Sequence, residues 1–109
     1  MLDHDLIQET PDTRTWARVT TFESESSERV EDALRKVVDH VTPLVRELPG
    51  WKGTLALATE NRRRGLVVTF WDSVEHMVAS GRTTAELRAD ADVVAGIERL
   101  EIVHEERPE

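Results

Sequence analysis

Cysteine and tyrosine are absent from this 109-residue sequence, and aromatic residues make up only 5% of it. The lack of cysteine excludes disulfides, thiol nucleophiles and thiolate metal sites, and it is compatible with the cytoplasm. No apolar run approaches the length of a membrane-spanning helix. The first residues also lack the basic and apolar segments of a secretion signal. We therefore expect a cytoplasmic protein that makes no contact with a membrane.

Positive charge is scarce as well, since 22 acidic residues and 14 basic ones leave a net charge of −8. Nucleic acids and anionic membranes are bound through basic surfaces, so neither is expected as a partner. The four histidines are dispersed, whereas a metal site needs clustered ligands. The sequence also lacks a glycine-rich phosphate loop and a Ser-His-Asp order. We expect neither a metal nor a bound cofactor.

The stretch from Gly65 to Ser73 is the most informative part of what is present. Residues 66–71 are apolar or β-branched, too few for a helix, and bounded by turn formers, which predicts a buried central strand. Asp72 and Glu75 then have the spacing of a capping box, which predicts a helix directly after the strand. Alternation divides the strand into two faces: Leu66, Val68 and Phe70 on one, and Val67, Thr69 and Trp71 on the other.

The spacing of apolar residues predicts the other elements. Strands are expected at Thr15–Phe22, Trp51–Thr59 and Ile97–His104, and helices from about Ser24 to Leu48, from Ser73 to about Ser80, and from Thr83 to about Asp92. The first helix carries one apolar stripe: Val30, Ala33, Leu34, Val37, Val38, Val41, Leu44, Val45 and Leu48. Because the stripe stays in phase across Pro43, we expect a kinked helix or two nearly coaxial helices, with Thr42 capping the second. Gly81 is expected to end the next helix.

The resulting β-α-β-β-α-β order predicts a ferredoxin-like fold of the α+β class: a four-stranded antiparallel sheet with both helices on one face. We expect an N-terminal arm (1–13), one domain (14–105) and a charged tail (106–109). Since the helices can cover only one face, the other face is expected to pack against a second copy in a homodimer.

Arginines in two places allow a functional interpretation. Arg18 lies on the same face of the first strand as Trp16. An edge-strand arginine that reaches water is the favoured interpretation, and an anchor for an anion in a pocket is the alternative. Arg62, Arg63 and Arg64 follow one another in a predicted hairpin loop. In an acidic protein such a run is more often a solvated loop tip than a phosphate site.

Several segments resemble the antibiotic biosynthesis monooxygenase (ABM) family of dimeric α+β barrels. They are Pro49-Gly50-Trp51, Leu66 to Ser73, and Thr84-Ala85-Glu86-Leu87-Arg88, within a similarity that runs roughly from Trp16 to Val103. The resemblance implies a homodimer with its two sheets face to face and a pocket in each subunit between sheet and helices. It also implies oxidation of aromatic polyketides by molecular oxygen without a cofactor, because the substrate supplies the electrons.

The resemblance assigns roles to individual residues. Trp71 matches a tryptophan of the family's pocket and Arg88 matches a helix arginine that stabilises developing negative charge, so both are expected to be catalytic. The expected substrate-binding residues are Trp16, Arg18, Val67, Thr69 and Met77. Val67 and Met77 stand where the family pattern has asparagine and tyrosine. The haem-degrading branch needs a helix histidine near Ser80, and His76 comes one turn too early, so haem is not expected.

Two functions remain open from the sequence. One is a cofactor-independent monooxygenase that acts on a small aromatic or polyketide-like substrate. The other is a homodimeric protein of the same fold that binds a small apolar or aromatic molecule without catalysis. A general base in the pocket would favour the first, and the face of Val67, Thr69 and Trp71 offers none.

Overall fold

A computed structural model describes residues 15–83, 94–106 and 108. The elements are β1 (Trp16–Glu23), α2 (Ser27–Lys36), a π-helical turn η1 (Val37–Val41), α3 (Thr42–Val45), β2 (Trp51–Ala58), β3 (Arg64–Trp71), α4 (Val74–Thr83) and β4 (Val94–Glu101). The predicted N-terminal arm, the predicted helix after Thr83 and Arg88 lie outside the described residues. The last strand begins at Val94 rather than at Ile97.

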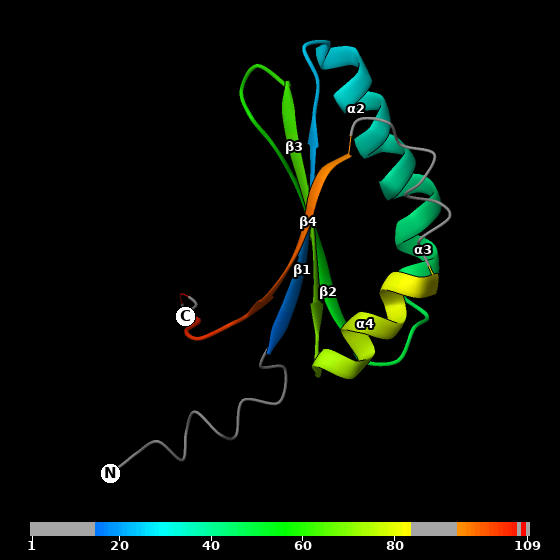
Figure 1. Ribbon diagram of the computed structural model, residues 1–109, viewed down its shortest axis with the longest axis vertical. Helices are drawn as coiled ribbons and strands as arrows, with labels where there is room; N and C mark the ends of the chain where they lie inside the picture. Colours follow the sequence, from blue (N-terminus) through cyan, green and yellow to red (C-terminus); the bar gives the residue numbers. More distant parts are fainter. Residues whose placement is uncertain (1–14, 84–93, 107, 109) are drawn as a thin grey trace.

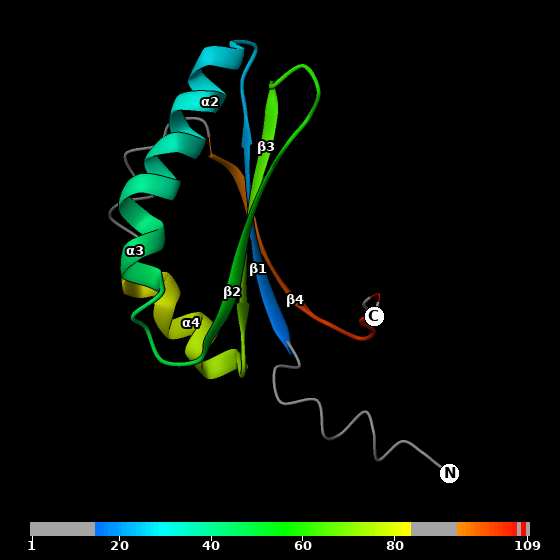
Figure 2. The ribbon, with the colours of Figure 1, turned by 180° about the vertical axis from the view of Figure 1, so that it is seen from behind.

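The four strands form one sheet in the order β2-β3-β1-β4, and each neighbouring pair is antiparallel. β3 and β1 are therefore central, whereas β2 and β4 are the edge strands of the described sheet. Figure 1 and Figure 2 show α2, α3 and α4 together on one side of the sheet. The predicted ferredoxin-like fold is confirmed.

The strand register separates the two faces of the sheet. Phe22 lies opposite Gly65, and Thr20 lies opposite Val67; Phe22, Thr20, Gly65 and Val67 are all buried, on the side that the helices cover. Leu66, Val68 and Phe70 alternate with these positions and are only partly covered. The prediction of a central strand buried on both faces is thus met on the helix side and only partly on the outer side of a single chain.

The interior between the sheet and the helices contains two hydrophobic clusters. The first consists of Phe22, Ala33 and Val67, with Leu34, Val37 and Val94 packed against it. The second consists of Val45, Trp71 and Met77, with Trp16, Val41, Leu48, Trp51 and Val74 around it. The clusters lie toward opposite ends of β1 and β3, since Phe22 and Trp71 stand near opposite ends of that strand pair.

The first helical run crosses Pro43 through the π-helical turn instead of breaking. Thr42 is the first residue of α3 rather than its cap, and its hydroxyl donates to the Val37 carbonyl at 3.1 Å. Val38 and Leu44 of the predicted stripe are 48% and 50% exposed. A π-helical turn contains more residues than an α-helical one, so it shifts the phase of the stripe and turns these two side chains outward.

Both ends of α4 differ from the prediction. The hydroxyl of Ser73, and not the carboxylate of Asp72, accepts from the backbone N–H of His76 at 3.2 Å. The carboxylate of Asp72 instead pairs with the His76 ring. Gly81 does not end the helix, which continues to Thr83. Gly81 has a packing role instead, because it faces Arg18.

Candidate functional site

Arg18 is buried in the interior between the sheet and α4. Its strand is central and its exposed fraction is 5%, so the interpretation as an edge-strand arginine that reaches water is wrong. Its Nη2 donates to the Met77 carbonyl and to Ser80 Oγ, both in α4. The guanidinium is thus held in place by the helix that covers it.

Trp71 forms an aromatic wall beside this cation. The side chain is completely buried, and its Nε1 donates to Thr69 Oγ1 at 2.8 Å. Arg18 Cζ lies 5.8 Å from the centroid of the Trp71 ring. That distance is within the range of a cation–π interaction, which is stronger where water is excluded. The indole and the guanidinium therefore pack as one buried unit.

The register extends this unit into two rows that run across the helix-facing side of the sheet. In one row Thr54, Thr69, Arg18 and Arg99 lie opposite one another on β2, β3, β1 and β4. In the next row Trp51, Trp71, Trp16 and Glu101 do the same. Side chains directly opposite in an antiparallel pair share a face and lie close together. All three tryptophans of the chain thus flank a polar row with two arginines.

α4 covers these rows with small or flexible side chains. Met77 is completely buried and Ser80 is 2% exposed. The two residues lie three positions apart, so they share a helix face with Gly81, four positions from Met77. A Cβ at position 81 would lie 3.3 Å from Arg18 Nη2, so glycine leaves room for the guanidinium.

The structure brings together most of the residues predicted for the site. Trp16, Arg18, Thr69, Trp71 and Met77 surround one region beneath α4. Val67 is also on the helix side, but it belongs to the other cluster, with Phe22 and Ala33. Arg88 lies outside the described residues, so its role stays a prediction.

Sequence reasoning overlooked Ser80 and Arg99 as members of this region. The spacing of Met77 and Ser80 on one helix face was a usable signal for Ser80. Alternation places Arg99 on the face of its strand opposite to Leu100, but it does not show that this face is the helix side, and the position of Arg99 opposite Arg18 depends on the pairing of β1 with β4. That pairing is not visible in the sequence.

An ion pair borders the site where β3 ends. His76 Nδ1 lies 2.7 Å from Asp72 Oδ1, and both side chains are 43% exposed. The hydrogen bond from His76 is the main cause that holds the pKa of Asp72 below its usual value. Gly50 closes this corner with φ +84°, and a Cβ there would lie 2.4 Å from both Asp72 Oδ1 and His76 Nδ1. Only glycine combines that conformation with such a close approach.

Two further searches concern the described ranges only. Within residues 15–83, 94–106 and 108, no group of three or more His, Cys, Asp or Glu residues could hold a metal ion. In the same part of the chain, no helix is long and apolar enough to cross a membrane.

No protein-family model and no curated protein matches the sequence. The fold does match solved structures. A monooxygenase from the gene ActVA-Orf6 of Streptomyces coelicolor, in complex with the ligand nanaomycin D, superposes with a TM-score of 0.72 and 16% identity, covering 88% of this chain and 94% of that one. A dimeric ferredoxin-like protein from an uncultured marine organism superposes with a TM-score of 0.70 and 14% identity. The match covers 94% of this chain and 99% of that one.

A third structure, provisionally assigned as an antibiotic biosynthesis monooxygenase from Bordetella bronchiseptica, gives a TM-score of 0.62 at 14% identity. It covers 84% of this chain and 100% of that one. At such low identity the likeness concerns the fold and not the chemistry. The chain therefore has the ferredoxin-like fold found in ABM monooxygenases and in dimeric proteins of the same architecture.

Proposed function

We propose that this protein binds a small aromatic molecule that carries a phenolate, enolate or carboxylate group, between the sheet and α4. The observation that carries the proposal is the buried guanidinium of Arg18, held by Met77 and Ser80 against the face of Trp71. The tryptophan row supplies flat apolar surface for an aromatic ring. The neighbouring polar row supplies positive charge for the anionic group.

The electrostatics of the site favour an anion. A guanidinium that is largely removed from water interacts more strongly with a ligand charge than one on the surface. Arg99 stands opposite Arg18 on the same face, and like charges directly opposite across two strands repel each other. An anion bound between them would interact favourably with both guanidiniums. This local positive charge contrasts with the net charge of −8 of the whole chain.

The reaction that fits this site is oxygenation without a cofactor, as the ABM resemblance implies. An anthrone-type substrate would lose a proton to form a phenolate or enolate, which Arg18 stabilises. The anion then gives its electrons to molecular oxygen. One oxygen atom replaces the two hydrogens of the ring CH₂ as a carbonyl, and the other leaves as water. The substrate is oxidised and oxygen is reduced, so no other reductant is needed.

Binding without catalysis is the second candidate, and one observation favours it. None of the helix-facing positions of β1 and β3 in the described sheet carries a carboxylate or a histidine that could remove a proton. Glu101 of β4 shares this face, opposite Trp16, but it is exposed. Oxygenation would therefore depend on a substrate that ionises readily once bound.

We also propose that the outer face of the sheet is the interface of a homodimer. Leu55, Leu57 and Leu100 on this face are 47%, 47% and 46% exposed in one chain, and they surround the half-buried Leu66, Val68 and Phe70. No helix of the described residues covers this side (Figure 2). A second copy of the same face would bury these leucines, and a similar structure is described as dimeric.

A titration with naphthoate followed by tryptophan fluorescence tests binding. Naphthoate should change the emission, because all three tryptophans belong to one row. Arg18→Met should weaken binding about tenfold or more, the size of a lost hydrogen bond to a charged group. A neutral naphthalene alcohol should bind both proteins equally, and Arg46→Gln, at an exposed position directly after α3, is the matched control. Equal naphthoate affinity in Arg18→Met would contradict the proposal.

Oxygen consumption with an anthrone then separates the two candidates. Catalysis predicts uptake of one oxygen per quinone formed, at a rate well above the uncatalysed one and reduced in Arg18→Met. Binding of naphthoate without any enhanced oxygen uptake would leave the non-catalytic function. Arg88→Ala, measured in the same two assays, tests the role that the ABM resemblance implies for that residue.

Sedimentation tests the homodimer. The wild-type chain should sediment as a dimer at micromolar concentration, and Val68→Asp, which places a charge on the outer face of β3, should sediment as a folded monomer. Glu60→Asp, in the hairpin loop, is a control that leaves the outer face unchanged. A monomeric wild-type protein would refute the dimer.

A further inference from the structure

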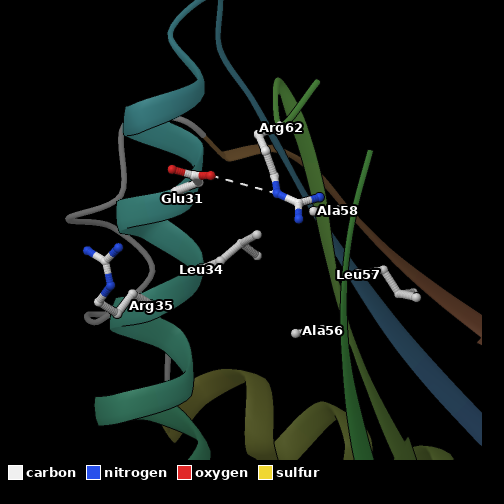
Figure 3. A pocket seen from close by; sticks show the side chains of 7 residues that line it. All are labelled: Glu31, Leu34, Arg35, Ala56, Leu57, Ala58 and Arg62. Atoms are coloured by element: carbon white, nitrogen blue, oxygen red, sulfur yellow. Dashed lines mark ion pairs between the residues drawn. The ribbon is translucent and has the colours of Figure 1, made fainter. Parts of the chain in front are cut away.

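A concavity lies between α2 and the edge strand β2, away from the Arg18 site. It has a volume of about 480 Å³. Its floor consists of Leu34, Ala56 and Ala58, and its rim of Glu31, Arg35 and Arg62 (Figure 3). Leu57, on the opposite face of β2, borders it at the outer edge of the strand. We call this the α2–β2 groove.

The groove exists because α2 packs over the centre of the sheet and not over its edge. Leu34 sits directly on Gly65 of β3, where a Cβ would meet Leu34 Cδ1 at 2.9 Å. Ala56 and Ala58 lie opposite Val67 and Gly65 and so face the helix side as well. Their methyl groups are too short to reach α2, and both residues remain exposed. The result is a narrow apolar floor that no side chain of α2 fills.

The rim of the groove is held by an arginine in an unusual conformation. Arg62 has φ +63°, the left-handed region that side chains larger than glycine rarely adopt. Its Nη1 donates to the Thr59 carbonyl at 3.0 Å, and its Nε lies 3.7 Å from Glu31 Oε2 on α2. Such backbone conformations persist where surrounding contacts hold them, and they are concentrated at ligand-binding sites. Figure 3 shows the Arg62 guanidinium between the hairpin and α2, beside the floor.

The contact between Arg62 and Glu31 leaves room for a competing carboxylate. At 3.7 Å the two groups attract each other without a normal hydrogen bond, and their side chains are 50% and 47% exposed. Exposed ion pairs of this kind contribute little stability. A ligand carboxylate that also buried an apolar chain could therefore displace Glu31. Arg35 also lines the rim, but its charge is neutralised by Asp32, whose Oδ1 lies 2.8 Å from Arg35 Nη1.

We propose that the α2–β2 groove binds a small amphiphile with a narrow alkyl body and a terminal carboxylate. The alkyl body would cover the methyl groups of Ala56 and Ala58 and the side chain of Leu34. The carboxylate would bind Arg62. The groove is lined by residues from the opposite end of the domain to Trp71, so this proposal is independent of the function proposed for the Arg18 site.

The test is a titration of the ¹⁵N-labelled full chain with octanoate, with octanol as the neutral analogue. Octanoate should shift the backbone amide signals of residues 31–35 and 56–62 and bind more tightly than octanol. Arg62→Gln should weaken octanoate binding about two- to fivefold, the range for an exposed ion pair, and leave octanol binding unchanged. Ala58→Phe, which fills the floor, should abolish binding of both. Thermal unfolding checks that each variant is folded.

Glu31→Gln distinguishes this mechanism from a general effect of charge. It removes the competitor for Arg62, so octanoate should bind about two- to fivefold more tightly. Glu28→Gln changes the net charge equally from an exposed position of α2 outside the groove, and it should have no effect. Equal effects of the two substitutions would overturn the proposed carboxylate position. Shifts centred on Trp71 or on the outer sheet face, or no binding at all, would overturn the groove as the site.

Discussion

The two clusters beneath the helices are built from the same two central strands, yet they differ in polarity. The cluster of Phe22, Ala33 and Val67 consists of apolar side chains, and its buried polar neighbour is the uncharged Thr20, opposite Val67. Around Trp71 and Met77, by contrast, lie the buried polar side chains of Arg18, Thr69 and Ser80. The two ends of one strand pair thus differ in the kind of side chain that they bury.

If the proposed function is correct, this difference in polarity separates residues that stabilise the fold from residues that bind the ligand. Apolar groups stabilise a domain by leaving water, and they need no particular partner. A buried guanidinium is unfavourable unless its donors are satisfied, so the fold must supply acceptors for it. Met77 and Ser80 do this for Arg18. Under the proposed function, Arg18 is retained at that cost for recognition of a ligand rather than for stability.

The largest effects on stability and binding are expected when the largest side chain of each cluster is removed. Phe22→Ala should cost about 3–5 kcal/mol in the free energy of unfolding, because Phe22 is only 1% exposed. Trp71→Ala should cost a similar amount. Urea denaturation measures both losses. Naphthoate affinity of the folded protein should stay within about twofold in Phe22→Ala and be lost in Trp71→Ala.

Replacement of Arg18 should affect ligand binding more than stability, the opposite of Phe22→Ala. Arg18→Met keeps an unbranched side chain of similar length and removes the charge, so the free energy of unfolding should change by no more than about 2 kcal/mol. Naphthoate binding should nevertheless fall at least about tenfold. A loss of stability as large as that of Phe22→Ala, with binding retained, would assign Arg18 a purely structural role.

A smaller effect is expected at the glycine that faces Arg18. Alanine normally stabilises a helix interior relative to glycine by roughly 0.5–1 kcal/mol. In Gly81→Ala the new Cβ would lie 3.3 Å from Arg18 Nη2, so we expect the gain to be cancelled. In the Arg18→Met background the same substitution should stabilise α4. A double-mutant cycle by urea denaturation should give a coupling of about 0.5–1 kcal/mol, and strict additivity would contradict the contact.

The smallest effect concerns the ion pair that borders the Trp71 cluster. The His76 hydrogen bond lowers the pKa of Asp72 from its usual 3.8. A carboxyl group with a depressed pKa stabilises the fold above its unfolded pKa, and this stabilisation is lost as pH falls through the folded value. The stability difference between wild type and Asp72→Asn should therefore be present near neutral pH and shrink below about pH 4. Glu47→Gln, at an exposed position, is the control, and a pH-independent difference would contradict this origin.

Much of the fold could be predicted from the sequence because its signals are local. The alternation from Leu66 to Trp71 specified a strand and both of its faces. The α2 stripe specified which side of that helix is apolar, although Val38 and Leu44 turned outward because the π-helical turn is not encoded by apolar spacing. Gly81 was mistaken for a helix end because a glycine required by a distant side chain looks the same in sequence as a capping glycine.

The sequence by itself determined the order of elements, the one-sided arrangement of the helices and the aromatic and cationic residues available for a site. Tertiary structure decided which of them meet. Arg18 became buried because its strand is central, and it meets Arg99, Thr69, Met77 and Ser80 through strand register and helix placement. Register and helix placement arise from contacts between residues far apart in the chain. No local pattern of side chains records them.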